Sequence, residues 1–248
     1  MSKLVLITGG ARGIGAATAL LAARQGYAVA VNYSANSLAA DEVVRQIRQA
    51  GGQAMTVQAD VSNEAQVVSM FEKIDAKFGR LSALVNNAGI VDQTARVDAM
   101  TLQRLQRMFE VNVFGSFLCA REAVKRMSTR YGGAGGSIVN VSSAASRLGS
   151  PGQYVDYASA KGAIDTFTLG LAKEVAAEGI RVNAVRPGII DTGIHASGGL
   201  PDRVREVAPQ LPMGRAGSAA EVAESIVWLL GDGASYSTGA LLDVAGGR

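Results

Sequence analysis

Two side chains with complementary acid–base chemistry lie one helical turn apart in the sequence. Tyr157 and Lys161 are separated by four positions, and residues at i and i+4 share one face of a helix. A phenol normally titrates at about 10, but an ammonium group roughly 5 Å away would favour the phenolate by about two pKa units. The pair therefore predicts a general acid–base catalyst working near neutral pH. A tyrosine and a lysine on the surface of one helix would give the same spacing, so the surrounding elements must decide.

The N-terminal segment has the pattern of a strand, a glycine-rich turn and a helix. Residues 4–7 are an uninterrupted apolar run, which is typical of a strand buried on both faces. Glycines in the following turn let the backbone approach a pyrophosphate, and the helix at 16–25 supplies amides and a positive dipole. A second strand at 28–33 completes the βαβ context, which supports a dinucleotide site. The turn residues expected at this site are Gly9, Arg12, Gly13, Ile14 and Gly15.

The turn reads T-G-x-x-x-G-x-G, and together with Y-x-x-x-K it makes the chain resemble the short-chain dehydrogenase/reductase family over essentially its whole length. Within that family the chain looks most similar to 3-oxoacyl-thioester reductases and sugar dehydrogenases. The resemblance implies an NAD(P)-dependent oxidoreductase that reduces a small-molecule carbonyl to an alcohol, or the reverse, by hydride transfer with Tyr157 as acid–base. It also implies a homotetramer that uses the helices around 102–130 and 154–178. A non-catalytic dinucleotide-binding regulatory protein on the same fold is the alternative.

Strand and helix patterns alternate along the whole chain. This alternation predicts one α/β domain over residues 1–248, a doubly wound parallel sheet of the Rossmann type with helices on both faces. Gly, Pro and Ser are frequent between Gly193 and Gly217, so we expect a substrate lid at about 189–217. The further strands are expected at 53–58, 81–85, 137–141, 180–185 and 240–244, and the further helices at 36–50, 63–78, 102–130, 154–178 and 219–230.

The end of the second strand indicates which cofactor is bound. A carboxylate there would bind the 2′-hydroxyl of NAD, but this chain has Asn32, Tyr33 and Ser34. Arg12, in the glycine turn, could pair with a 2′-phosphate. We therefore predict NADP(H), with NAD(H) as the less favoured cofactor; if Arg12 is only a solvated loop charge, this preference weakens.

Other cofactor contacts are implied by the family resemblance. Asp60 and Val61 would meet the adenine, although helix capping explains Asp60 nearly as well. A second group would pack under the cofactor or clamp its nicotinamide and pyrophosphate: Asn87, Ala88, Gly89, Pro187, Gly188, Ile190 and Thr192.

The resemblance also implies a catalytic serine and a helix asparagine. Ser143 precedes Tyr157 by fourteen residues, one more than the family's usual spacing, and Ser142 precedes it by fifteen. We assign the catalytic role to Ser143 and a structural hydroxyl to Ser142, with the additional residue in a surface loop near 153–156. Asn112 lies in an apolar helix stretch and needs a partner; in the family such a residue kinks the helix and holds a water beside the lysine.

Composition excludes several other classes of protein. Hydrophobic residues make up 48% of the chain and charged residues 18%, which allows a large core, and the net charge of +3 is spread without a basic run that would bind nucleic acid. Lys125, Arg126 and Arg130 could attract an acidic carrier, but a solvated helix face explains them as well. No membrane span or signal peptide is evident, which favours the cytoplasm. Cys119 reads as a buried hydrophobe and His195 as a loop residue or substrate contact, so no metal is expected.

Overall fold

Seven parallel strands form the centre of the protein. The computed structural model describes residues 3–248, and its main sheet has the strand order β3-β2-β1-β4-β5-β6-β9. This is the doubly wound sheet that the sequence predicts. The strands are β1 (Leu4–Ile7), β2 (Ala28–Tyr33), β3 (Ala54–Gln58), β4 (Ala83–Asn86), β5 (Gly136–Val141), β6 (Ile180–Pro187) and β9 (Leu241–Val244).

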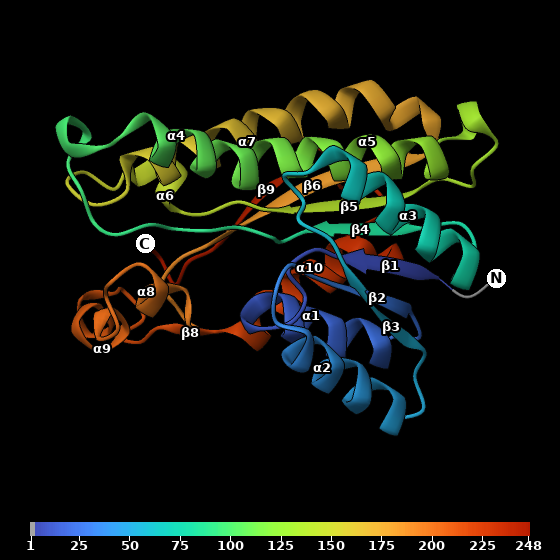
Figure 1. The fold of residues 1–248 in the computed structure, drawn as a ribbon, viewed down its shortest axis with the longest axis horizontal. Helices are drawn as coiled ribbons and strands as arrows, with labels where there is room; N and C mark the ends of the chain where they lie inside the picture. Colours follow the sequence, from blue (N-terminus) through green and yellow to red (C-terminus); the bar gives the residue numbers. More distant parts are fainter. Residues whose placement is uncertain (1–2) are drawn as a thin grey trace.

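Helices cover both faces of this sheet, as Figure 1 shows. One layer contains α1 (Gly13–Arg24), α2 (Ser37–Gln49) and α10 (Ala219–Leu230), and the other contains α3 (Glu64–Phe78), α4 (Leu102–Phe109), α5 (Gly115–Met127) and α7 (Val155–Val175). Four of these helices begin at polar caps: the side chains of Asn36, Asn63, Thr101 and Ser218 accept hydrogen bonds from backbone amides of the first turn.

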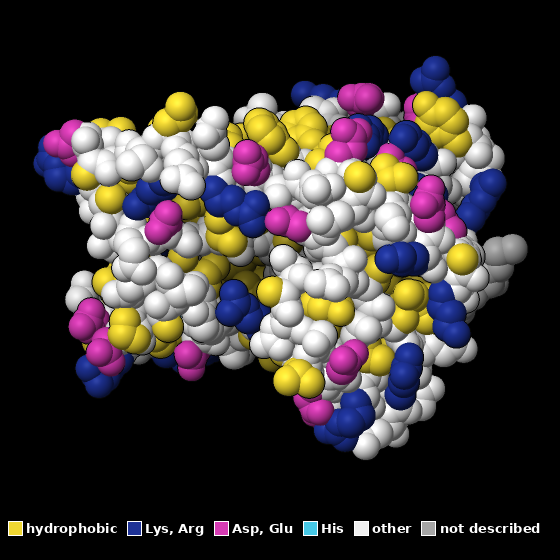
Figure 2. All heavy atoms as spheres, in the orientation of Figure 1, with side chains coloured by type: hydrophobic (Ala, Val, Ile, Leu, Met, Phe, Trp, Pro, Cys, Tyr) yellow, Lys and Arg dark blue, Asp and Glu magenta, His cyan; other side chains and the backbone are white. Residues whose placement is uncertain are grey.

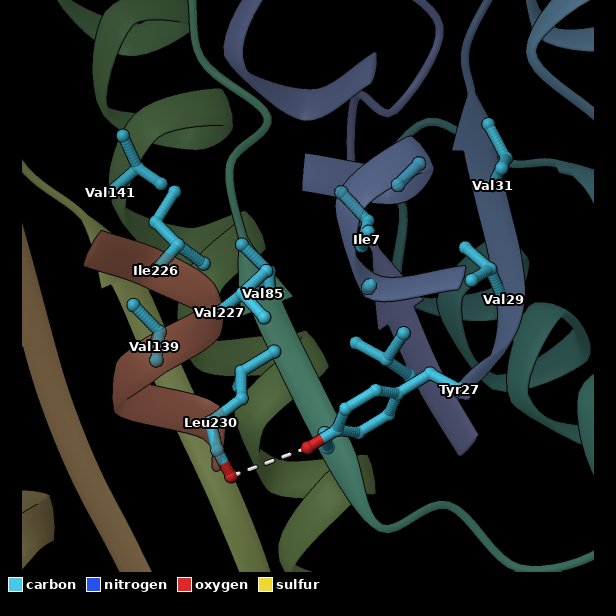
Figure 3. Packing of buried hydrophobic residues seen from close by; sticks show 14 of the residues in the cluster. Ile7, Tyr27, Val29, Val31, Val85, Val139, Val141, Ile226, Val227 and Leu230 are labelled. Carbon is cyan, nitrogen blue, oxygen red and sulfur yellow. Dashed lines mark hydrogen bonds between the residues drawn. The ribbon is translucent and has the colours of Figure 1, made fainter. Parts of the chain in front are cut away.

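Strands β1 to β6 send side chains into two separate cores, one on each face of the sheet. In β1, Val5 and Ile7 pack with the α1, α2 and α10 layer, and Leu4 and Leu6 pack with the opposite layer. Figure 3 shows the first core, where the Tyr27 hydroxyl also donates a hydrogen bond of 3.4 Å to the Leu230 carbonyl. Cys119 is fully buried in the second core and burial raises its pKa to about 12, which confirms its interpretation as a buried hydrophobe.

The chain reverses its strand order at the middle of the sheet. Strand β1 pairs with β2 on one side and with β4 on the other, all in parallel. The loops that follow β1 and β4 therefore diverge at the carboxyl ends of the strands and leave a crevice, which is where ligands bind in open α/β sheets.

The long helix expected at 102–130 is interrupted. Five residues, Glu110–Phe114, form a π-helical turn between α4 and α5, and the segment ends in a 3-10 turn at Thr129–Tyr131. The π turn contains Asn112, whose side-chain amide bonds to the chain at Ile90. A polar side chain that needs an outside partner thus accounts for the local change of helix type.

The sequence patterns missed several short elements around the crevice. Three are helices, α6 (Ala145–Leu148), α8 (Ile194–Ser197) and α9 (Arg203–Val207), and two are paired strands, β7 (Ile190–Asp191) and β8 (Gly217–Ser218). They are too short to show a periodicity. In the described part of the chain, residues 3–248, no helix is both long and apolar enough to cross a lipid bilayer.

Candidate active site

One cavity of about 530 Å³ lies at the carboxyl ends of the strands and extends from the glycine turn to the segment that contains α8 and α9. Figure 2 shows a hollow on this face, with hydrophobic side chains on its floor and Lys or Arg side chains at its rim. Of the predicted site residues, two do not line the cavity, Gly15 and Asn112. Those that line it are Gly9, Arg12, Gly13, Ile14, Asn32, Tyr33, Ser34, Asp60, Val61, Asn87, Ala88, Gly89, Ser143, Tyr157, Lys161, Pro187, Gly188, Ile190 and Thr192.

The glycine turn opens the first turn of α1 toward the cavity. Gly9 and Gly13 have φ values of 60° and 54°, in the left-handed region that other residues rarely adopt. Arg12 precedes the helix in an extended conformation, and no described side chain caps the helix. The first amides of α1 are therefore free to bind an anion.

Gly15 allows close packing between the glycine turn and Asn87. A Cβ atom on Gly15 would lie 2.4 Å from the carbonyl oxygen of Gly9 and 2.6 Å from Nδ2 of Asn87. That Nδ2 atom donates to the carbonyl oxygens of Thr8 and Gly9, at 2.9 and 3.0 Å. Asn87 therefore fastens the turn to the end of β4, and this packing requires glycine at position 15.

Asn32 fastens the same turn to the neighbouring strands. It is 1% exposed; its Oδ1 accepts from the Gly9 amide at 3.1 Å and its Nδ2 donates to the carbonyl oxygens of Val57 and Ala59. The side chain that we predicted against the cofactor thus makes its hydrogen bonds within the protein, although the residue lines the cavity.

Two arginines, Arg12 and Arg107, line the cavity at the end near the glycine turn and differ in their partners. Arg107 donates to Asp60 at 3.3 Å and to Ser62 at 2.9 Å. Arg12 is exposed and forms no ion pair with any of residues 3–248. Asp60 does not cap α3, because Asn63 does so; this removes the capping alternative for Asp60.

Helix α7 places Tyr157 and Lys161 in the same part of the cavity. Lys161 is 4% exposed; its ammonium lies 5.5 Å from the centre of the Tyr157 ring and donates to the carbonyl oxygen of Val141 at 2.8 Å. Burial lowers the pKa of Lys161 to about 8, an effect that Asp165 opposes. The predicted pair is therefore brought together in one environment.

The expected direction of the Tyr157 pKa shift is wrong for the protein as it stands. Burial raises the pKa of Tyr157 to about 12, and hydrogen bonding to Ser143 lowers it by less. The spacing of the two residues indicates the nearby cation but not the cost of burying a phenolate. At neutral pH the phenol is protonated, which suits a proton donor.

The two serines after β5 have different surroundings. The Ser142 hydroxyl is buried and donates to the carbonyl oxygen of Lys161 at 3.2 Å, which is the structural role predicted for it. Ser143 lines the cavity beside Tyr157. The surface loop expected near 153–156 is wrong, because α7 begins at Val155 and Asp156 is buried in an ion pair with Arg104 at 2.7 Å.

Asn112 supports the site from below. Its Oδ1 accepts from the Ile90 amide at 3.2 Å, and its Nδ2 donates to the carbonyl oxygens of Ile90 and Met108, both at 3.0 Å. A Cβ atom on Gly89 would lie 2.8 Å from that Oδ1 and 3.5 Å from the Lys161 ammonium. Asn112 therefore has the partner that its burial requires, and both it and Lys161 lie next to Gly89.

The segment expected to clamp the cofactor, which contains Ile190 and Thr192, lies against the glycine turn. Thr192 lies 3.4 Å from the position of a Cβ atom on Gly13, and Ile190 offers its carbonyl oxygen to Nε2 of His195 at 3.0 Å. Burial lowers the pKa of His195, and the bond to Ile190 raises it by less. His195 lines the cavity, and no group of His, Cys, Asp and Glu suited to hold a metal ion occurs in residues 3–248.

The segment after the clamp rests on the start of α7. The Tyr154 hydroxyl donates to the carbonyl oxygen of Gly198 at 2.9 Å, and Arg203 donates to the Gln153 side chain at 2.8 Å. Tyr154, Arg203 and Arg248 all line this end of the cavity, and sequence reasoning singled out none of them. Of these three residues, only Arg203 lies in a segment that the sequence indicated, the expected lid.

The basic residues proposed to attract an acidic carrier are outside this site. Lys125 pairs with Glu122 at 2.7 Å, and Arg126 pairs with Glu122 at 3.0 Å and with Asp75 at 2.7 Å. Neither of these residues lines the cavity, and Arg130 does not line it either. The structure thus favours the charged helix face over a recruiting patch.

Comparison with known proteins identifies the family and supports the fold. The profile of the family described as Enoyl-(Acyl carrier protein) reductase matches residues 9–248. The chain belongs to the short-chain dehydrogenase/reductase family. It is 61% identical over 245 residues to "Uncharacterized oxidoreductase YgfF" of Escherichia coli (strain K12), which covers 99% of both chains. It is 42% identical over 248 residues to "Cis-4-hydroxycyclohexanecarboxylate dehydrogenase" of Sinomonas cyclohexanicum, covering 99% of this chain and 96% of that one.

A solved structure shows the same architecture. A doubly substituted variant of a short-chain dehydrogenase/reductase from Serratia marcescens superposes with a TM-score of 0.90 at 33% identity, covering 99% of this chain and 97% of its own. The predicted family and fold class are therefore confirmed, and the protein is an oxidoreductase of this family.

Proposed function

We propose that this protein reduces a small-molecule carbonyl to an alcohol, or catalyses the reverse, with NADP(H) as the preferred cofactor. The observation that carries the proposal is the convergence of Tyr157, Lys161 and Ser143 in the cavity that begins at the glycine turn. The residues fit a dinucleotide, because the first amides of α1 are uncapped, Gly13 has the left-handed conformation that shapes the turn, and Arg12 is available for a phosphate.

The nicotinamide cofactor supplies or accepts the hydride when bound. Tyr157 donates its proton to the carbonyl oxygen, and its raised pKa keeps the phenol protonated at neutral pH. Ser143 hydrogen-bonds the same oxygen and stabilises the charge that develops on it. Lys161 binds the nicotinamide ribose and, when protonated, favours the phenolate left on Tyr157. Asn112 holds a water that links Lys161 to bulk solvent.

Two further parts of the proposal concern the surroundings of the site. Residues 189–217 act as the substrate lid, since they contact Tyr154 and Gln153 at the start of the catalytic helix. A cytoplasmic location remains a prediction from the sequence.

A homotetramer is also proposed, with α5 and α7 in its interfaces. Phe114, Phe117 and Leu169 are each at least 40% exposed, and Phe117 stacks on Phe167 with ring centres 3.8 Å apart. Large apolar side chains in such a patch favour association. Light scattering after gel filtration should give four times the chain mass of 25.5 kDa; a mass of one chain at micromolar concentration would contradict the tetramer.

The experiment that tests the activity is a panel of ketones, sugars, oxo acids and acyl thioesters, with NADPH consumption as the readout. The acyl thioesters follow from the family description, and the cyclic oxo acids follow from the name of the relative from Sinomonas cyclohexanicum. Reduction of at least one class is expected. Tight NADPH binding without consumption on any carbonyl would instead favour the non-catalytic regulatory alternative.

A further inference from the structure

Two arginines share the lid end of the cavity. Arg203 is the first residue of α9, and Arg248 follows β9, so segments far apart in the sequence meet here. Both residues are half-buried. Neither guanidinium forms an ion pair within residues 3–248.

The Arg203 side chain and the Arg248 backbone are both held at the cavity without an acidic partner. Arg203 donates to Oε1 of Gln153 at 2.8 Å, and its Cζ lies 5.9 Å from the centre of the Tyr154 ring. Arg248 belongs to a tight turn: its amide donates to Ala245 at 3.2 Å, and its backbone oxygen accepts from Arg147 at 3.1 Å. The Arg203 guanidinium and the Arg248 backbone are therefore in place before a ligand arrives.

The charge of these two side chains is not neutralised by a neighbouring acidic side chain. Asp60 is the only Asp or Glu among the described residues that line the cavity, and it is engaged by Arg107 and Ser62 at the opposite end. Burial lowers the pKa of Arg248, and the positive charge of Arg203 lowers it further. Two like charges in one partly buried cavity are unfavourable until an anion joins them.

Much of the remaining lining is apolar, although Ser150 and His195 also contribute to it. The apolar side chains that line the cavity include Val91, Leu148 and Ile194, together with Ala144 and Ala145. A substrate that fits must therefore combine a hydrocarbon body with one anionic group. A planar carboxylate matches the fork of guanidinium donors, which bind it in a bidentate manner.

We propose that the substrate is a small oxo acid, or the matching hydroxy acid, whose carboxylate binds to Arg203 and Arg248 while its carbonyl meets Tyr157. This rests on the proposed function. In the reduction, the carbonyl carbon gains a hydride from the nicotinamide and its oxygen gains the proton of Tyr157; the carboxylate makes and breaks no bond. Arg203 and Arg248 are therefore specificity residues of the site.

The test compares 4-oxocyclohexanecarboxylate with its methyl ester, using NADPH and the whole protein. The acid should have the higher kcat/KM, by about tenfold to a hundredfold, because a charge-assisted hydrogen bond to a carboxylate has that value. Arg203→Gln and Arg248→Gln should each lower this preference by about tenfold, because kcat/KM for the acid falls while that for the ester stays unchanged. Arg203→Lys should restore part of it, which separates charge from packing.

Arg205→Gln is the matched control. Arg205 lies in the same short helix as Arg203, but its side chain is 79% exposed and pairs with Asp202, outside the cavity. The preference for the acid should be unchanged in this variant. Equal rates for acid and ester in the wild type, or an equal loss on both substrates in the two Gln variants, would overturn the proposal. So would a preference for a phosphorylated ketone over the acid.

A binding measurement separates failure of this inference from failure of the proposed function. If no carbonyl is reduced, the proposed activity is wrong. Calorimetry on the NADP⁺-saturated protein then tests the anion site by itself. Cyclohexanecarboxylate should bind at least about tenfold more tightly than cyclohexanecarboxamide, and Arg203→Gln should remove the difference. Equal affinity for the acid and the amide would overturn the anion site by itself.

Discussion

The two ends of the cleft satisfy their polar groups in opposite ways. At the glycine turn, the side chains of Asn32 and Asn87 each bond to at least two backbone groups of neighbouring strands and turns. At the catalytic end, the buried ammonium of Lys161 has one hydrogen-bond partner among the described residues, the carbonyl oxygen of Val141. Its pKa is lowered to about 8, while that of Tyr157 is raised to about 12.

The two ends therefore have different roles, one structural and one catalytic. The glycine turn is a rigid support whose hydrogen bonds stabilise the fold and leave backbone amides for a phosphate. The catalytic end contains titratable groups in surroundings that disfavour their charged forms, which is how active sites obtain unusual pKa values at the expense of stability. Substitutions at the two ends should therefore change the free energy of unfolding in opposite directions.

The largest expected effect on stability is on its pH dependence in Lys161→Met. Between pH 8 and 10.5 the unfolded lysine keeps a proton that the folded one has lost, so this residue makes stability rise with pH across that window. Urea unfolding at several pH values should show the wild type gaining about 3 kcal/mol relative to Lys161→Met. At pH 7 the variant should be the more stable protein.

Lys173→Met provides the control for that comparison, because Lys173 is exposed on the same helix. Its stability should follow the wild type across the pH range. Parallel curves for the wild type and Lys161→Met would mean that the buried ammonium is not a cost to the fold.

A smaller effect of the opposite sign is expected at the glycine turn. In Gly15→Ala the new Cβ meets the Gly9 carbonyl oxygen at 2.4 Å, so the backbone must shift, at a cost of about 2 kcal/mol in unfolding free energy. Gly170→Ala is the matched change, since no described atom lies within 4 Å of the added Cβ in helix α7. That variant should gain about 0.5–1 kcal/mol from helix propensity. Equal stability of both variants in urea would show that the turn is not tightly packed.

The smallest effect concerns Arg12, the one charge of the glycine turn without a partner among residues 3–248. Arg12→Gln should raise KM for NADPH by about tenfold and leave KM for NADH unchanged, because only NADPH carries the 2′-phosphate. Arg24→Gln, at the other end of α1, should change neither value. A wild type that uses NAD(H) at least about tenfold better than NADP(H) would overturn the cofactor preference.

Sequence reasoning predicted well what depends on local pattern. The strands and long helices follow from apolar runs and periodicity, and the placement of Tyr157 and Lys161 in one cavity follows from their spacing on α7. The partner of Asn112 was expected from burial of a polar group, and the structure identifies it as Ile90.

The rest depends on contacts that no local pattern contains. Arg203 and Arg248 meet only because the lid segment and the chain after β9 fold toward the same end of the cavity. The raised pKa of Tyr157 depends on how deeply α7 is covered, which spacing does not reveal. The short helices α8 and α9 are held by Tyr154 and Gln153 rather than by their own periodicity.

The most direct test of the account measures NADPH affinity and turnover on one preparation of Tyr157→Phe. The variant should lose at least about a thousandfold in kcat, because the proton donor is gone, while Kd for NADPH stays within about twofold of the wild type. Tyr236→Phe, which changes an exposed phenol that does not line the cavity, should keep the turnover of the wild type. Substantial turnover in Tyr157→Phe, or a loss of NADPH affinity that matches the loss of rate, would contradict the division between a binding end and a catalytic end.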